Sequence, residues 1–289
     1  MKTNVTKPSS LIEFLQEHYP DSPRTRIKKL LQSGTIRVND KPVTLHSYPL
    51  KPGDIFEINK QAGIAAKAGL PFPVLFEDQD VIVVDKPAGI STSSTDGSLN
   101  IQEILSVFLR AQSKGRVRAH VVHRLDKEVS GVLLFAKTHE AMEIIKDKWQ
   151  ETEKHYYALV EGTPKEADGT IKSWLLEDKS QKVHSVNERP EAKYSITNYT
   201  TIKKVDDNTL LDIKTDTGRK NQIRVHLFDI GCPIVGDRKY GASAEIKRRV
   251  RLHAYSLSFP HPISGKTIII KSQMPEGFLS LKLKDERYK

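Results

Sequence analysis

The chain has 289 residues, more than one ordinary domain needs, so we expect a small module joined to one larger domain. Its formal net charge of +10 and pI of about 9.4 predict a polyanionic partner, chiefly nucleic acid, although an anionic membrane surface attracts the same charge. The single cysteine, Cys232, excludes a disulfide within the chain and a cysteine cluster for zinc. No apolar run approaches the roughly 18 residues of a membrane span, and residues 1–10 lack a secretory signal, so we expect a cytoplasmic protein.

Residues 10–31 predict two short helices. The first carries apolar residues at helical spacing and ends at Tyr19-Pro20. The second begins at Ser22-Pro23, a typical N-cap followed by a typical first helical residue. Its exposed face is basic, through Arg24, Arg26, Lys28 and Lys29. Such a charge run, taken alone, is more often a solvated helix face than a binding surface.

Residues 36–38 and 41–43, joined by Asn39-Asp40, predict a hairpin next to this basic helix. The stretches SPRTRIKKLLQSGTIRVNDKPV and LKPGDIFEI, in this order, make residues 10–58 resemble the S-four RNA-binding module. The resemblance implies a small α/β module that binds RNA, for which the basic helix face is the candidate contact surface.

Residues 59–70, NKQAGIAAKAGL, are small and polar without strand alternation, so we expect a linker that lets the module move. The boundary of the larger domain is placed near Pro71, which gives a domain of residues 71–289. Residues 1–70 hold eleven Lys or Arg against six Asp or Glu, so the small module is the denser in positive charge.

The larger domain mixes strands and helices. Strands are expected at residues 81–84, 131–136, 251–259 and 267–271, and a further strand is expected to contain Tyr156. Residues 193–205 and 209–215 are expected to form an antiparallel pair. Helices are expected at residues 100–112, 139–149 and 221–230.

One carboxylate stands out in HVVHRLDKEVSGVLLFAK, residues 120–137. Arg124 and Lys127 flank Asp126 and would keep it ionised, and the strand at 131–136 would hold its loop rigid. Two other segments, KHYYALVEG at 154–162 and TGRKNQIRVHL at 217–227, supply an aromatic hydroxyl and a further arginine.

At these residues the chain resembles the RluA-type pseudouridine synthases. HRLDKEVSGVLLFAK looks like their signature, and VIVVDKPAGI, KHYYALVEG, TGRKNQIRVHL, PIVGDRKYG and RLHAYSLSFPHP follow in the family's order. The resemblance, over residues 74–275, implies an α+β fold with a mixed, mainly antiparallel sheet and flanking helices. It implies isomerisation of uridine to pseudouridine in RNA, with no cofactor.

Residue by residue, Asp126 matches the catalytic aspartate, Tyr156 the active-site tyrosine and Arg224 the basic partner of the aspartate. Arg124 matches the arginine that helps to displace the target base. We therefore expect the side chains of Asp126, Tyr156 and Arg224 to converge in one basic cleft. Tyr157, next along the strand, should face away.

The reaction breaks a nitrogen–carbon bond, turns the uracil and forms a carbon–carbon bond, so a deprotonated carboxylate suffices. It either attacks the anomeric carbon of the ribose or takes a proton from the neighbouring ribose carbon, and both routes stay open. The target must first be flipped out, at a cost of about a few kcal/mol. Tyr156 can stack on the base and take part in removing the proton from uracil carbon five.

Each residue also has a structural interpretation. Asp126 could cap its loop, Arg124 and Arg224 could form buried ion pairs, and Tyr156 could be core. His120, His123 and Asp126 have a spacing that superficially resembles metal ligands, but the strand alternates faces, and we expect no metal. His123 is expected to be an orienting hydrogen-bond donor.

The chain departs from the family at two places. Where the family commonly reads Gly-Arg-Thr-His-Gln, this chain has Lys220-Asn221 in the middle, and Val129 replaces a usual Thr. Neither departure touches the four matched residues. Lys220 adds positive charge where an RNA phosphate could pass, so we expect the choice of substrate to differ from that of the best-known family members.

The leading hypothesis is an RNA pseudouridine synthase, with ribosomal RNA favoured over transfer RNA because the N-terminal module suggests a large structured substrate. The sequence leaves the oligomeric state open, and a monomer is favoured. A non-catalytic RNA-binding or ribosome-assembly protein is the alternative of another class. A small-molecule glycosidase is less favoured, because such enzymes usually need two carboxylates and these motifs offer no second one.

Overall fold

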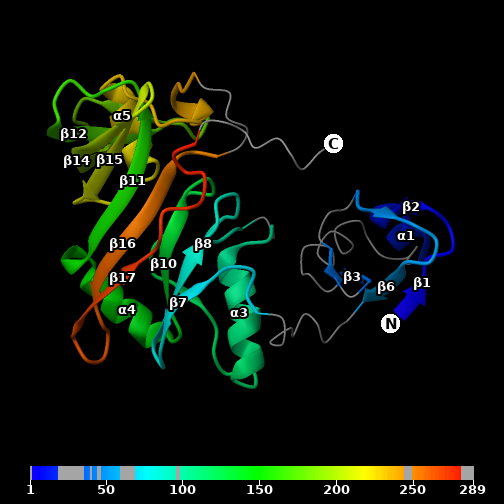
Figure 1. The fold of residues 1–289 in the computed structure, drawn as a ribbon. Coiled ribbons are helices and arrows are strands. Elements are labelled where there is room, and N and C mark those ends of the chain that lie inside the picture. The colour runs from blue at the N-terminus through cyan, green and yellow to red at the C-terminus, as the bar shows by residue number, and fades with distance from the viewer. Residues whose placement is uncertain are drawn as a thin grey trace. The chain divides into compact units, whose positions relative to one another are not determined.

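The computed structural model describes residues 2–18, 36–39, 41–43, 47–58, 69–95, 98–243 and 249–280. The chain divides into two compact units, Met1–Pro71 with Ser93–Ala119, and Phe72–Thr92 with His120–Lys289 (Figure 1). Among the described helices, none is both long enough and apolar enough to cross a membrane.

The N-terminal segment forms a small four-stranded antiparallel sheet beside a short helix. Its strands are, in spatial order, β1 (Lys2–Asn4), β6 (Ile55–Ile58), β3 (Ile36–Val38) and β4 (Lys41–Pro42), and β2 (Ser9–Ser10) pairs separately with β5 (Pro49–Leu50). Helix α1 (Leu11–His18) starts at a capping box, in which Glu13 Oε2 accepts from the Ser10 amide at 2.9 Å. Its apolar face, Leu11, Phe14 and Leu15, packs with Phe56 in a separate core.

The first predicted helix and the hairpin are thereby confirmed. The second predicted helix lies outside the described residues, and so do Arg24, Arg26, Lys28 and Lys29.

Helix α3 (Ile101–Gln112) confirms the helix predicted at residues 100–112. Asn100 is its N-cap rather than its first residue, because the Asn100 side chain accepts from the Glu103 amide at 2.9 Å. The buried residues Ile101, Leu105 and Leu109 share one face of α3, as the spacing predicts.

The second unit is built on an eleven-stranded sheet, whose main path runs in the order β13-β12-β14-β15-β11-β16-β10-β8-β7. The strands are β7 (Val74–Glu77), β8 (Val81–Lys86), β9 (His120–Val121), β10 (Ser130–Ala136), β11 (Glu153–Glu161), β12 (Asp168–Glu177), β13 (Val183–Val186), β14 (Lys193–Val205), β15 (Asn208–Thr215), β16 (Leu252–Pro260) and β17 (Thr267–Lys271). Within this described sheet only β10 and β16 pair in parallel, so the predicted mixed, mainly antiparallel sheet is confirmed.

Strands β8 and β10 form the rigid centre on which the loop containing Asp126 is mounted. Every residue of β10 is buried, and Val132 and Leu134 pack with Ile145 of α4 (His139–Asp147). After α4 the chain makes a single-turn helix, η2 (Trp149–Glu151), before β11. A strand buried on both faces reads as a continuous apolar run, and this is why SGVLLFA was recognisable in the sequence.

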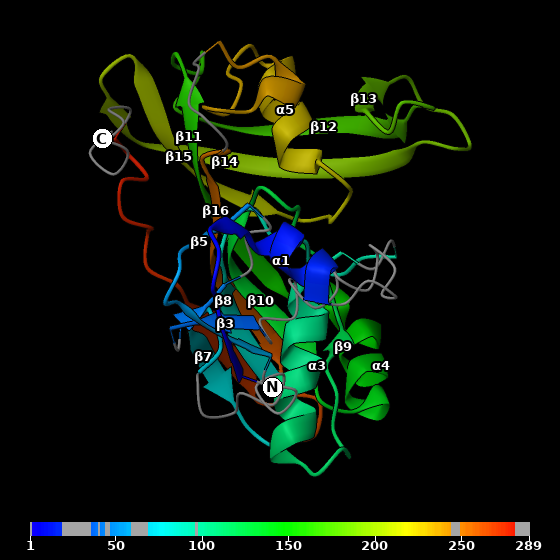
Figure 2. The ribbon, with the colours of Figure 1, turned by 90° about the vertical axis from the view of Figure 1, so that its right-hand side faces the viewer.

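Helix α5 (Gln222–Asp229) lies across β12, β13 and β14, as Figure 2 shows. His226 anchors it: the ring is fully buried, with Nδ1 2.9 Å from Thr197 Oγ1 and Nε2 3.0 Å from Ser173 Oγ. Burial lowers the pKa of His226 to about 4, so the ring is neutral. The anchored helix begins at the residues that reach Asp126, and a second single-turn helix, η3 (Arg238–Tyr240), follows it.

Candidate active site

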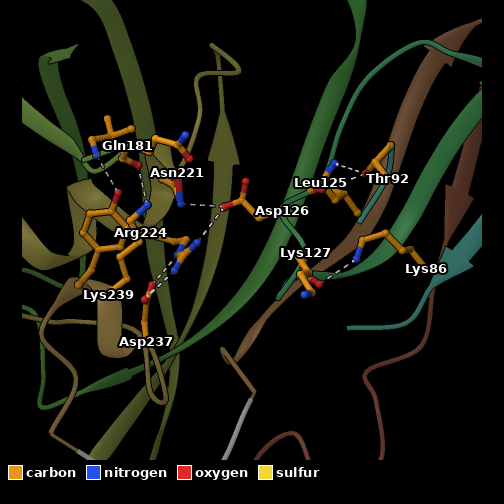
Figure 3. A network of polar contacts seen from close by, with 12 residues as sticks. Lys86, Thr92, Leu125, Asp126, Lys127, Gln181, Asn221, Arg224, Asp237 and Lys239 are labelled. Carbon is orange, nitrogen blue, oxygen red and sulfur yellow. Dashed lines mark hydrogen bonds and ion pairs between the residues drawn. The ribbon is translucent and has the colours of Figure 1, made fainter. Parts of the chain in front are cut away.

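The loop that carries Asp126 joins β9 to β10 and is held by the segment that follows β8. Thr92 Oγ1 donates to the Leu125 carbonyl at 2.9 Å and accepts from the Leu125 amide at 3.1 Å. The Gly89 amide donates to the Lys127 carbonyl at 2.7 Å. These bonds fix the backbone on both sides of Asp126, so its side chain projects from a rigid turn (Figure 3).

Lys86, at the end of β8, is fully buried and donates its ammonium hydrogens to backbone carbonyls. Its acceptors are the carbonyls of Pro87 at 3.0 Å, Ile90 at 2.8 Å and Lys127 at 3.3 Å. Burial lowers the pKa of Lys86 to about 8, although the negative charges of Asp126 and Glu128 oppose the shift. The ammonium therefore supports the loop and adds positive potential beneath Asp126.

Arg224, on α5, reaches Asp126 from a segment about a hundred residues later in the chain. Its Nη1 donates to Asp126 Oδ2 at 3.2 Å, while Nε and Nη2 donate to the two oxygens of Asp237 at 2.6 and 2.7 Å (Figure 3). The side chain of Arg224 is 8% exposed and that of Asp237 1%, whereas Asp126 is 30% exposed. Asp237 thus holds the guanidinium of Arg224 in a bidentate pair. The remaining nitrogen, Nη1, meets the carboxylate of Asp126, which solvent can reach.

The charge of Arg224 is secure. Burial acts to lower its pKa, but the hydrogen bonds and charge of Asp237, followed by those of Asp126, outweigh burial and raise the pKa above its ordinary value.

Asn221, the residue just before α5, also contacts Asp126. Its Nδ2 donates to Asp126 Oδ2 at 3.2 Å. The view that the Lys220-Asn221 departure leaves the four matched residues untouched is therefore wrong for Asn221.

Tyr156, on β11, lies close enough to Asp126 for the two groups to interact electrostatically. Burial first, and then the negative charge of Asp126, raise the pKa of Tyr156 to about 12, against a hydrogen bond with Thr215. The hydroxyl of Tyr156 therefore stays protonated at neutral pH. Tyr157 stacks on Tyr255 with ring centroids 3.9 Å apart, as expected for the opposite side of the strand.

Three further basic residues, Arg124, Lys220 and Lys239, differ in their contacts. Arg124 is exposed to solvent. Lys220 pairs with Glu177 at the surface. Lys239 donates to the Gln181 carbonyl at 2.8 Å, and its pKa is lowered by burial and then by the charges of Arg224 and Lys220. Arg124 and Lys220 are thus exposed to solvent, while Arg224 is buried and paired with Asp126.

His123 is an acceptor at Nε2, so the expectation of an orienting donor is wrong for that atom. The Leu134 amide of β10 donates to His123 Nε2 at 3.1 Å. Burial, followed by the charge of Lys154, lowers the pKa of His123 to about 3, and the neutral ring then carries its proton on Nδ1. His123 ties the start of the loop to the central strand.

A group of possible metal ligands lies elsewhere in the described part of the chain. Asp78, Asp80 and His261 bring one ligand atom each within 4.8 Å of one another. Asp78 Oδ1 accepts from the amides of Asp80 and Val81, both at 2.8 Å, and His261 Nε2 lies 2.9 Å from Asp78 Oδ2. Through these hydrogen bonds the group connects the turn between β7 and β8 to the residue that follows β16.

Comparison with known proteins identifies the family and the fold. Residues 80–228, which include Asp126, Tyr156 and Arg224, match the family described as RNA pseudouridylate synthase. The chain belongs to this family. Residues 11–56 match the S4 domain. The chain is accordingly an isomerase of the RNA pseudouridine synthase class that carries an N-terminal S4 domain.

Relatives are similar over nearly the whole chain. A protein of Aquifex aeolicus described as an uncharacterized RNA pseudouridine synthase is 35% identical, over 94% of this chain and 92% of that protein. The ribosomal large subunit pseudouridine synthase C of Buchnera aphidicola (subsp. Baizongia pistaciae) is 33% identical, over 95% of this chain and 94% of that protein. Among solved structures, human RNA pseudouridylate synthase domain containing 4 shares the fold with a TM-score of 0.62, at 23% identity, over 76% of this chain and 94% of that chain.

Sequence reasoning missed three residues that the structure places around Asp126: Lys86, Asn221 and Asp237. A lysine that ends the apolar run VIVVDK was a signal for the first, because lysine is rarely buried without a specific partner. Asn221 stood out only as a departure from the family's pattern, which does not reveal a contact with Asp126, and Asp237 follows a glycine as a turn aspartate does.

Proposed function

We propose that this pseudouridine synthase acts on ribosomal RNA and uses Asp126 as its catalytic group. The observation that carries the proposal is the pairing of a partly exposed carboxylate with a buried arginine that Asp237 holds in place. A purely structural ion pair has no need of a carboxylate that is open to solvent. Relatives named as ribosomal large subunit pseudouridine synthases support the choice of RNA.

The chemistry follows from the arrangement. Arg224 Nη1 and Asn221 Nδ2 both donate to Asp126 Oδ2, and either chemical route needs this carboxylate to be deprotonated. Asp126 attacks the anomeric carbon of a flipped-out uridine or removes a proton from the neighbouring ribose carbon, and the glycosidic bond breaks in both cases. The freed uracil turns in the pocket, and carbon five bonds to the anomeric carbon as the bond from Asp126 to that carbon breaks or, on the other route, as Asp126 returns the proton to the ribose. Carbon five then loses its proton to solvent, nitrogen one takes up a proton, and no other reactant is consumed.

Tyr156 and Arg124 act on the base. Because the pKa of Tyr156 is about 12, its hydroxyl is protonated in the resting site, so it stacks on the uracil and donates a hydrogen bond. Arg124, exposed two residues before Asp126, takes the place that the flipped base leaves in the RNA stack.

The chain divides RNA binding and catalysis between two parts. Residues 10–58 serve as the RNA-binding module, residues 59–70 as a linker and residues 71–289 as the catalytic domain, which works in the cytoplasm as a monomer. The match to the S4 domain and the density of positive charge in residues 1–70 support this division. Lys220 adds a phosphate contact at the rim of the site, once it exchanges Glu177 for RNA.

The test is Asp126→Asn, which preserves shape and removes the charge. On ribosomal RNA labelled with tritium at uracil carbon five, from a strain lacking this gene, tritium release should fall by about a thousandfold or more while RNA binding persists. Asp168→Asn, at an exposed position of β12, is the matched control and should keep wild-type activity. Full activity of Asp126→Asn would sink the assignment, and a wild type that makes no pseudouridine on any RNA would favour a binding role instead.

A further inference from the structure

Asn221 has an unusual backbone for the residue that precedes a helix. Its φ of 55° and ψ of 15° place it in the left-handed region, and its side chain makes no capping bond to α5. Asparagine tolerates this conformation better than most residues, and at an N-cap it usually bonds its own helix. Here the side chain is instead turned toward Asp126, and the residue as a whole is only 7% exposed.

The position of Asn221 is set by its neighbour rather than by Asp126. Gln222 Oε1 accepts from Thr217 Oγ1 at 2.8 Å and from the Arg219 amide at 3.0 Å. Gln222 Nε2 donates to the Ile196 carbonyl at 2.9 Å and to Thr197 Oγ1 at 3.0 Å. The loop is thereby fixed to β14, so the amide of Asn221 is already in place when RNA arrives.

The two donors to Asp126 share one oxygen. Asn221 Nδ2 and Arg224 Nη1 each lie 3.2 Å from Oδ2 (Figure 3). Among the residues that the structure describes, no hydrogen bond to Oδ1 is formed, and the carboxylate is 30% exposed. Oδ2 is thus the anchored oxygen, and Oδ1 is the one with free lone pairs.

Arg224 alone would anchor Asp126 weakly. Two of its nitrogens are engaged by Asp237 at 2.6 and 2.7 Å, and only Nη1 remains for Asp126, at the longer distance of 3.2 Å. With a single donor a carboxylate can turn about its bond to Cβ; a second donor from another direction opposes this rotation.

We infer that Asn221 is a positioning residue, which fixes the rotation of the Asp126 carboxylate so that Oδ1 faces the ribose. The inference rests on the proposed role of Asp126. Both chemical routes need one oxygen directed at a ribose atom, so the requirement is the same whichever route operates.

The test is Asn221→Gly, which removes the donor while glycine keeps the left-handed backbone without strain. In single-turnover assays on tritiated ribosomal RNA, we expect the maximal rate to fall about tenfold or more, the usual effect of losing a hydrogen bond to a charged group. The RNA concentration at half-maximal rate and the melting temperature should match those of Asp206→Gly. That control changes another left-handed residue, with φ of 52°, in the exposed turn between β14 and β15.

A second variant keeps the inference testable if the glycine variant is unstable. Asn221→Asp has nearly the same shape and turns the donor into a second carboxylate against Asp126, so the maximal rate should fall further. Wild-type rates in a folded Asn221→Gly or Asn221→Asp protein would overturn the inference and leave the proposed function intact. Activity in Asp126→Asn would overturn the proposed function itself.

Discussion

Lys86 shows how a single buried charge holds the loop that carries Asp126. Its ammonium satisfies three backbone carbonyls, of Pro87, Ile90 and Lys127, and the last of these directly follows Asp126 in the chain. Burying the ammonium is costly, and burial accordingly lowers the pKa of Lys86 to about 8. The need of three buried carbonyls for a donor explains why a lysine stands where an apolar residue would fill the same space.

We predict that Lys86→Met lowers the free energy of unfolding at pH 7 by about 1–3 kcal/mol, because three buried carbonyls lose their donor. The pKa of Lys86 is about 8 in the folded state and 10.5 ordinarily, so the unfolded chain binds more protons between these values. The stability of the wild type relative to the variant should then rise with pH from 8 to 10.5, by up to about 1.4 kcal/mol per pH unit.

Urea denaturation of both proteins at several pH values measures this difference, and all other titrating groups cancel in it. A difference that stays constant over the window would mean that Lys86 is not desolvated as the structure indicates.

At the scale of elements, the junction of β10 and β16 holds the loop of Asp126 to the rest of the sheet. Ser130 and Gly131 pair in parallel with His253 and Ala254. Gly131 has a φ of +118°, and a Cβ built on it would lie 2.1 Å from the Ala254 carbonyl oxygen. Only glycine allows the two backbones to approach this closely.

Gly131→Ala should therefore lower the free energy of unfolding by about 3 kcal/mol or more, because backbone strain and a clash with backbone atoms add. Gly162→Ala is the matched control. Gly162 also has a positive φ, of +73°, but nothing lies within 4 Å of a built Cβ, so only the strain of about 1 kcal/mol remains. Equal midpoints of urea denaturation for the two variants would contradict the close packing of β10 on β16.

The same elements show what the sequence could and could not predict. Strands β8 and β10 were recognisable as apolar runs, and β14 and β15 as alternating ones. Strand β12 was not expected, because its apolar residues do not alternate with polar ones. Ile171 and Leu175 face one side of the strand, while Trp174 and Leu176 face the other.

The site divides in the same way. Asp126, Tyr156 and Arg224 stand in motifs and could be named from the sequence. The bond from Asn221 could not, because it depends on a left-handed backbone that Gln222 fixes through contacts with a distant strand. Asp237 likewise acquires its role only when the chain after α5 folds back and buries it.

At the scale of the whole molecule, positive charge is densest in a segment of the sequence other than those that carry Asp126, Tyr156 and Arg224. Residues 1–70 hold eleven basic residues against six acidic ones, and four of the basic ones fall in the short stretch RTRIKK. If this stretch binds RNA phosphates, it contributes to affinity through counterion release, and the rate with bound RNA depends on the catalytic residues alone.

We therefore predict that replacing Arg24, Arg26, Lys28 and Lys29 together by alanine weakens RNA binding and leaves the single-turnover rate at saturating RNA unchanged. The plot of log affinity against log salt should lose about three units of slope, since each lost phosphate contact removes about 0.7–0.9. The control replaces the exposed Lys146, Lys148, Lys203 and Lys204 by alanine, which lowers the net charge by the same amount. Filter binding to ribosomal RNA at several salt concentrations measures both. Equal slopes for the two variants would show that total charge, rather than the N-terminal segment, governs affinity.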